Sequence, residues 1–272
     1  MELGEKRAAF AREGLGVAAM TYDSQAILKS FSDRKGVTYP LLTDPDSKVI
    51  RAFGILNEGM PKGTPYYGVP HPGTYIVDAN GVVKRKFFET DYKERYTAGS
   101  ILFQVSPEAA KQGWQEAKTN HLTLRWRTTD DKAHAGSRTT LVLEVALAKN
   151  MHVYAPGVQE GYIPVKWTLG SEAIVKSDDV RWPRSKVLDL KAIKEKAPVY
   201  EGRFTVEQDV TFAQQKPLQS AVRDGRLEFE GSFKYQACDQ KECYPPVTVP
   251  LKWTVGFETL DSTRVPDELR RK

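Results

Sequence analysis

The pattern of hydrophobic and polar positions changes once along the chain. Residues 1–100 mix helical spacing, in which apolar side chains recur every three or four positions, with short apolar runs typical of strands. Residues 121–257 contain one alternating apolar and polar stretch after another. We predict an α/β domain, a linker, a β domain and a polar tail. Their expected bounds are 1–103, 104–120, 121–258 and 259–272.

The first part has few strands for a stable sheet. A turn at Asn80-Gly81 between two apolar runs predicts a hairpin. Helix starts are expected at Asp23 or Ser24 and at Asp46 or Ser47, whose side chains can cap a first turn. The predicted order is a helix ending within 6–13, a strand at 15–21, a helix to residue 34, an extended piece at 41–43, a helix from about 47, strands at 73–77 and 82–88, and a helix at 92–103.

The second part contains five runs in which apolar side chains recur at every second position, interrupted only at Gln208 and Gly231. Half-buried strands in this number predict an antiparallel β-sandwich of immunoglobulin-like architecture. The usual inter-sheet cysteines of antibody domains are missing. The inward positions are Leu122, Leu124 and Trp126; Leu141, Leu143, Val145 and Leu147; Phe204, Val206, Val210 and Phe212; Leu227, Phe229, Phe233 and Tyr235; and Val249, Leu251, Trp253, Val255 and Phe257.

Charge and hydropathy narrow the function classes. The net charge of +5 arises from mixed acidic and basic residues rather than from a basic patch, so we expect no nucleic-acid partner. No apolar run approaches the roughly 18 residues of a membrane span, and we expect no direct membrane insertion. The charged start of the chain is not a signal peptide.

Two cysteines, Cys238 and Cys243, are the only ones in the chain. Cys238 does not continue the series of inward positions in the preceding strand, which places it at a strand end or on the outer face. The prolines at 245 and 246 predict a turn that brings the two cysteines within disulfide range. A structural zinc needs four ligands, and the four histidines are scattered. Spacing alone leaves a structural disulfide slightly ahead of a redox pair, with metal binding last.

The run YQACDQKECYPPVTVPL resembles the cysteine segment of the amino-terminal periplasmic domain of the thiol–disulfide reductase DsbD. NMHVYAPG and APVYEGRFTVEQDV support the resemblance, which spans about residues 120–257. It implies an immunoglobulin-like fold and a Cys238–Cys243 disulfide that exchanges with thioredoxin-like partners. Tyr154 and Tyr235 are then candidate neighbours of the pair, although a half-buried strand tyrosine is the slightly favoured interpretation of either.

The same resemblance implies a loop that caps the disulfide. Members of the family carry an aromatic residue and an acidic pair in this loop, whereas the matching residues 188–196 here contain no aromatic side chain. Ile193 is the candidate cap.

Residues 16–55 and 71–88 resemble peroxiredoxins of the alkyl hydroperoxide reductase and thiol-specific antioxidant family. The shared features are a helix, Leu-Leu-Thr-Asp-Pro, then Ile-Val-Asp-x-x-Gly. The resemblance implies an incomplete thioredoxin-like fold in which Pro72 matches the cis-proline that faces the active site; the alternative is an ordinary loop proline. No cysteine precedes Cys238, so peroxidase activity would need a cysteine upstream of Met1. We expect the chain to be a fragment of a longer protein; the alternative is that this domain has lost its chemistry.

The leading hypothesis is a thiol–disulfide oxidoreductase or electron-relay protein, with a peroxide-detoxifying system as its wider setting. Its expected partner is a thioredoxin-like protein or a membrane thiol–disulfide reductase. The alternative is a non-enzymatic interaction module with a structural disulfide. We expect no cofactor and no metal. The resemblance implies a periplasmic or otherwise extracytoplasmic location in a bacterium.

Overall fold

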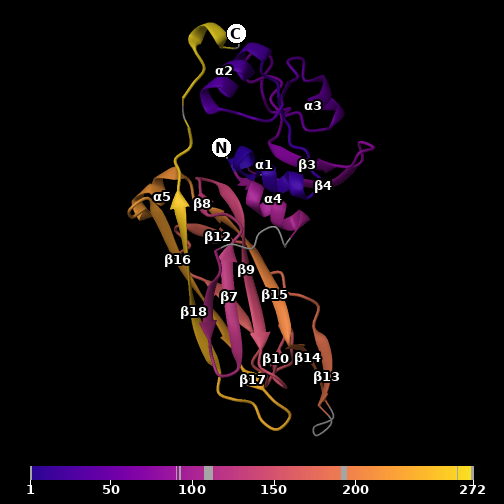
Figure 1. Cartoon of the computed structure of the whole chain (residues 1–272), viewed down its shortest axis with the longest axis vertical. Coiled ribbons are helices and arrows are strands. Elements are labelled where there is room, and N and C mark those ends of the chain that lie inside the picture. The colour runs from indigo at the N-terminus through magenta and orange to yellow at the C-terminus, as the bar shows by residue number, and fades with distance from the viewer. Residues whose placement is uncertain are drawn as a thin grey trace. The chain divides into compact units, whose positions relative to one another are not determined.

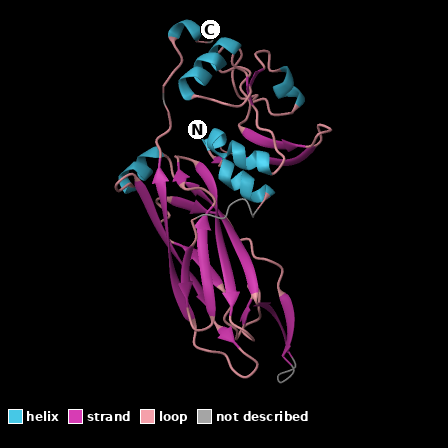
Figure 2. Ribbon diagram, in the orientation of Figure 1, coloured by secondary structure: helices cyan, strands magenta, loops and turns pink. Residues whose placement is uncertain are grey.

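The computed structural model describes residues 2–89, 91, 93–106, 113–190, 195–261 and 263–270. The chain divides into two compact units (Figure 1), Met1–Ala110 together with Leu260–Lys272, and Lys111–Thr259. Most helices belong to the first unit, and the long strands belong to the second (Figure 2). No helix in the described ranges is both long enough and apolar enough to cross a bilayer.

The first unit is a small α/β assembly. Strands β1 and β2 pair in parallel, and β3 and β4 form the predicted hairpin. Helices α1 and α4 pack through Phe10, Ile101 and Leu102. The elements are α1 (Glu2–Arg12), β1 (Ala19–Thr21), α2 (Gln25–Lys35), β2 (Leu41–Thr43), α3 (Lys48–Ala52), β3 (Gly73–Val77), β4 (Val83–Phe88), β5 (Arg95–Tyr96), α4 (Ala98–Val105) and the 3-10 helix η2 (Asp267–Leu269).

Local capping sets the helix ends of this unit. Ser24 caps α2 as predicted, and Gly36 ends it in the left-handed conformation, with φ of 61°. Helix α3 begins directly after Ser47, in agreement with the predicted start, although the capping hydrogen bonds from two backbone N–H groups of the helix go to the Asp44 carboxylate rather than to the Ser47 side chain. Helix α4 begins later than the predicted residue 92, since Thr97 caps it.

The second unit is a β-sandwich, as the alternating pattern predicts. One sheet has the strand order β12-β15-β9-β7-β6 and the facing sheet has the order β11-β16-β18-β8. Its strands are β6 (Gln115–Lys118), β7 (Leu122–Thr128), β8 (Lys132–Ala133), β9 (Ser137–Leu147), β10 (His152–Tyr154), β11 (Lys166–Leu169), β12 (Val175–Ser177), β13 (Lys186–Leu190), β14 (Glu195–Glu201), β15 (Arg203–Phe212), β16 (Arg226–Tyr235), β17 (Ala237–Cys238) and β18 (Val247–Phe257), with helix α5 (Gln215–Ala221) before β16.

Part of the segment predicted to be a linker belongs to this sandwich. Residues 115–118 form β6, which pairs antiparallel with β7 from Gln115 opposite Trp126 to Lys118 opposite Thr123. Their polar side chains give no apolar periodicity, because an edge strand needs to bury little apolar surface.

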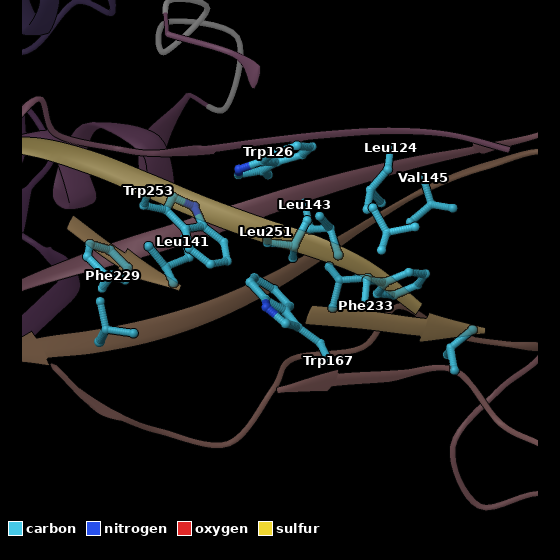
Figure 3. Packing of buried hydrophobic residues seen from close by; sticks show 14 of the residues in the cluster. Leu124, Trp126, Leu141, Leu143, Val145, Trp167, Phe229, Phe233, Leu251 and Trp253 are labelled. Atoms are coloured by element: carbon cyan, nitrogen blue, oxygen red, sulfur yellow. The ribbon is translucent and has the colours of Figure 1, made fainter. Parts of the chain in front are cut away.

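The inward positions of the alternating runs form the main core. Leu147 and Phe257, at the ends of their strands, are only partly buried, and the other members of the predicted set are buried. The rings of Phe229 and Trp253 stack with centroids 5.4 Å apart, and Trp167 stacks on Trp253 at 6.2 Å. Figure 3 shows part of this core: Leu124, Trp126, Leu141, Leu143, Val145, Trp167, Phe229, Phe233, Leu251 and Trp253.

A third sheet extends the sandwich and carries the cysteines. Its order is β13-β14-β10-β17, and its pairs are antiparallel. Two of its strands are continuations of strands in the other sheets. Only Gly202, with φ of 65°, separates β14 from β15, and only Gln236 separates β16 from β17. The cysteine strand is therefore anchored to the core through covalent continuity with β16.

Candidate functional site

The two cysteines form a disulfide across a short turn. Their Sγ atoms are 1.96 Å apart and their α-carbons 4.0 Å apart. Cys238 ends β17, and Cys243 faces it as an isolated antiparallel bridge. The predicted turn that brings the pair together is confirmed.

Asp239 organises this turn. Its Oδ1 accepts hydrogen bonds from the backbone N–H groups of Lys241 at 2.7 Å and Glu242 at 2.9 Å. Its Oδ2 accepts the hydroxyl proton of Tyr244 at 3.0 Å. These bonds, first those from Glu242 and Lys241 and then that from Tyr244, lower the pKa of Asp239. A carboxylate that stays ionised therefore lies beside the disulfide and holds the loop closed.

The third sheet has two differently packed faces. Val153 pairs with Ala237 and with Tyr200, and all three side chains belong to the main core. Cys238 belongs to a second, smaller cluster. This cluster contains the buried residues Tyr154, Ala197, Val199 and Cys238, with Val158, Tyr162 and Leu188 packed against them.

The smaller cluster corrects the sequence-based placement of Cys238. Strand parity correctly places this residue outside the main core, but the side chain is only 1% exposed. Val158 and Tyr162 of one loop and Leu188 of β13 pack against the cluster that contains it. Cys243, in contrast, is exposed. A thiolate from solvent therefore has an open approach to the Cys243 side of the bond and a covered one to Cys238.

Tyr154 lies next to the disulfide. Its hydroxyl is 3.9 Å from Cys243 Sγ, and its ring contacts that of Tyr162 with centroids 4.6 Å apart. Tyr162 donates a hydrogen bond to Glu195 at 2.6 Å, which raises the pKa of Tyr162 to about 12. Burial raises the pKa of Tyr154. Both phenols therefore stay protonated at neutral pH and act as hydrogen-bond donors.

The other predicted neighbours have different surroundings. Tyr235 belongs to the main core, and its hydroxyl bonds to the Thr119 hydroxyl at 2.7 Å. Ile193 lies outside the described residues, although β13 of the same hairpin contributes Leu188 to the cluster. Pro72 lies in the first unit, where it lines a cavity of about 520 Å³. Its peptide bond is trans, so the expected cis isomer is wrong; trans is the commoner isomer of an X–Pro bond.

Two residues near the pair are not predicted from the sequence. Tyr162 follows a glycine in a loop, with no periodicity to identify it. His152 is one of four histidines scattered along the sequence, but the register places it directly opposite Cys238. The NMHVYAPG segment could have identified His152, because strand alternation puts it on the same face as Tyr154, a candidate neighbour of the cysteines. In the described part of the chain, no group of three or more His, Cys, Asp or Glu side chains could hold a metal ion.

Comparisons with known families agree with the two-part organisation. Residues 121–252 match the family described as "Thiol:disulfide interchange protein DsbD, N-terminal", and residues 1–86 match the AhpC/TSA family. The first region is therefore peroxiredoxin-like and of thioredoxin-like class, and the second carries a DsbD N-terminal domain with an immunoglobulin-like sandwich.

Curated relatives match the first region. A Mycobacterium tuberculosis protein named "Putative peroxiredoxin" is 36% identical over 74 residues, which are 27% of this chain and 46% of the relative. "Putative peroxiredoxin bcp" of Haemophilus influenzae is 28% identical over 83 residues, 30% of this chain and 53% of the relative. The chain thus spans about half the length of the curated relatives it matches.

Solved structures resemble the chain more weakly. The N-terminal periplasmic domain of ScsB from Proteus mirabilis aligns with a TM-score of 0.36 and 17% identity, over 54% of this chain and 51% of that one. The reduced N-terminal domain of Neisseria meningitidis DsbD aligns with a TM-score of 0.24 and 17% identity, over 43% and 77%. The assignment of the β domain rests on the family match rather than on these alignments.

Proposed function

We propose that this protein is a thiol–disulfide oxidoreductase or electron-relay protein in which the Cys238–Cys243 disulfide exchanges with a thioredoxin-like partner. The observation that carries the proposal is the unequal exposure of the two cysteines, in a domain that matches the DsbD N-terminal family. Cys243 is exposed, whereas Cys238 is 1% exposed. An incoming thiolate then has one target sulfur and one leaving group.

The exchange proceeds through a mixed disulfide. The partner thiolate attacks Cys243 Sγ, the partner S–Cys243 bond forms, and the Cys243–Cys238 bond breaks. Its electron pair goes to Cys238 Sγ, which leaves as a thiolate. A second partner thiolate then attacks the partner sulfur of the mixed disulfide and releases Cys243 as a thiolate. The partner becomes oxidised and the pair becomes a dithiol, which can pass two electrons to a downstream disulfide.

Trapping the mixed disulfide tests this assignment. The probe is a reduced thioredoxin whose second active-site cysteine is replaced by Ser. With wild-type protein we expect a covalent adduct at Cys243, identified by peptide mapping, and none with Cys243→Ser. The measured reduction potential of the pair should lie well above about −300 mV, the region of inert structural disulfides. A potential below that region, or no adduct, overturns the proposal.

The trapping experiment also distinguishes the proposed exchange from the alternative, a non-enzymatic interaction module with a structural disulfide. The features that favour this alternative are the burial of Cys238 and the hydrogen-bonded turn, both of which suit a permanent staple. A staple predicts that replacing both cysteines lowers stability while leaving partner binding intact.

The location and the wider role belong to the proposal as well. Disulfides persist in oxidising compartments, and the cysteine segment resembles that of the periplasmic domain of DsbD; both support an extracytoplasmic site of action. A membrane thiol–disulfide reductase is the other expected partner of the exchange. The peroxiredoxin-like region suggests a peroxide-detoxifying system, but this sequence has no thiol before Cys238 to form a sulfenic acid. Labelling of the reduced cysteines in intact cells with a membrane-impermeant reagent tests the location.

A further inference from the structure

His152 occupies a position that the exchange chemistry leaves unexplained. It pairs with Cys238 across β10 and β17, so the two side chains leave the same face of the sheet. The residue is only 7% exposed, and its Nε2 atom is buried with no hydrogen-bond partner. A buried polar atom without a partner is unfavourable and calls for an explanation.

The charged and titratable groups around His152 are few. Glu201 lies opposite it on β14 and forms an ion pair with Lys186 at 3.2 Å. Asp239, the residue after Cys238, interacts electrostatically with His152 as well. On its own strand the nearest titratable ring is that of Tyr154, edge-on with centroids 5.6 Å apart. Burial lowers the pKa of His152, against the opposite influence of Glu201 and Asp239. The imidazole is therefore neutral at neutral pH while the disulfide is closed.

We propose that His152 stabilises the thiolate that Cys238 becomes when the disulfide opens. The inference rests on the proposed function, because it concerns the leaving group of that exchange. As the Cys243–Cys238 bond breaks, its electron pair and one negative charge remain on Cys238 Sγ. His152 takes one proton from solvent and pairs with the thiolate as an imidazolium. The opening of the disulfide thereby consumes one proton at this site.

Two electrostatic effects support this role. A thiolate at a side chain that is 1% exposed is costly unless it is paired. The neighbouring carboxylate of Asp239 increases that cost through like charge, so an adjacent cation is needed. A thiolate that forms beside His152 also favours the charged imidazolium, so the pKa of His152 rises when the disulfide opens. The unpartnered Nε2 of the oxidised protein is then the donor that the reduced protein uses.

The test compares His152→Gln with His134→Gln in the full chain. His134 is a suitable control because it lies in the same unit but contacts Glu258 rather than the cysteines. Thiolate absorbance of the reduced proteins is titrated with pH, and the rate of adduct formation with the thioredoxin probe is measured from pH 5 to 8. We expect His152→Gln to show about a tenfold smaller thiolate fraction and about tenfold slower exchange at neutral pH, with a flatter pH profile. His134→Gln should match wild type.

Equal titrations and pH profiles for wild type and His152→Gln overturn the inference, while exchange by wild type leaves the proposed function standing. Absence of exchange in wild type overturns both. If His152→Gln does not fold, the wild-type protein alone decides, through NMR titration of the His152 ring. Its pKa must be higher in the reduced than in the oxidised protein, and equal values overturn the inference.

Discussion

The two sulfurs of the site differ in their surroundings although they are bonded to each other. Cys238 is 1% exposed within a cluster against which Tyr162, Leu188 and Val158 pack, whereas Cys243 is exposed. In the exchange proposed above, this difference directs attack to Cys243, because thiol exchange depends on access as well as on thiolate character. At the scale of individual residues, the disulfide therefore joins one exposed and one buried cysteine.

The lowered pKa of His152 predicts how the free energy of unfolding of the oxidised protein depends on pH. Its folded-state pKa lies below the value of about 6.5 in an unfolded chain, so the unfolded chain binds more protons between those two values. The stabilisation from neutral His152 is fully present above about pH 6.5 and is lost as the pH falls below it.

Urea unfolding of the oxidised protein between pH 5 and 8 measures this effect. The wild-type midpoint should rise with pH more steeply than that of His152→Gln, which lacks the titrating group. Parallel curves for the two proteins would show that His152 does not titrate differently on folding.

Among the secondary-structure elements, the turn between β17 and β18 holds the cysteines together. Three hydrogen bonds converge on the carboxylate of Asp239, and the Tyr244 backbone N–H bonds to the Ala237 carbonyl at 2.9 Å. The ring of His121 contacts that of Tyr244, with centroids 4.6 Å apart. This preorganisation keeps the two thiols close after reduction and so favours re-formation of the disulfide.

Asp239→Ala should loosen this turn. With its acceptor oxygens gone, the reduced thiols spend less time in contact, and the equilibrium constant for disulfide formation against glutathione should fall by about three- to tenfold. Glu242→Gln is the matched control, because it removes a charge from the same turn and keeps the acceptors of Asp239. Equal equilibrium constants for Asp239→Ala and Glu242→Gln would show that the turn does not preorganise the pair.

In the molecule as a whole, the redox pair and the main core belong to one unit. Every residue of that core, like both cysteines, lies within Lys111–Thr259. The described residues of this core are therefore supplied by the second unit itself. The domain bounds suggested by the sequence remain predictions, although β6 begins the sandwich before residue 121.

A fragment comprising residues 111–259 should fold alone and keep its redox behaviour. We expect a single cooperative unfolding transition in urea and a reduction potential equal to that of the full chain within error. A fragment that melts without cooperativity, or whose disulfide has a different potential, would show that residues outside 111–259 support the site.

Features that depend on local order could be predicted from the amino-acid sequence. Strict alternation indicated the sandwich and its inward side chains, because successive residues of a strand point to opposite faces. The prolines and the short spacing indicated the cysteine turn. Parity also excluded Cys238 from the main core. Where neighbours in the chain decide the outcome, as at the Ser24 cap of α2, the prediction and the structure agree.

The surroundings of the site, in contrast, depend on the packing of distant strands. His152 meets Cys238, Tyr154 meets Cys243, and Leu188 packs into the same cluster across sequence separations of about 50 to 90 residues. Such contacts follow from the register between those strands, and a shift of one residue would turn each side chain to the opposite face. The burial of Cys238, the exposure of Cys243 and the position of the unpartnered imidazole are consequences of that register.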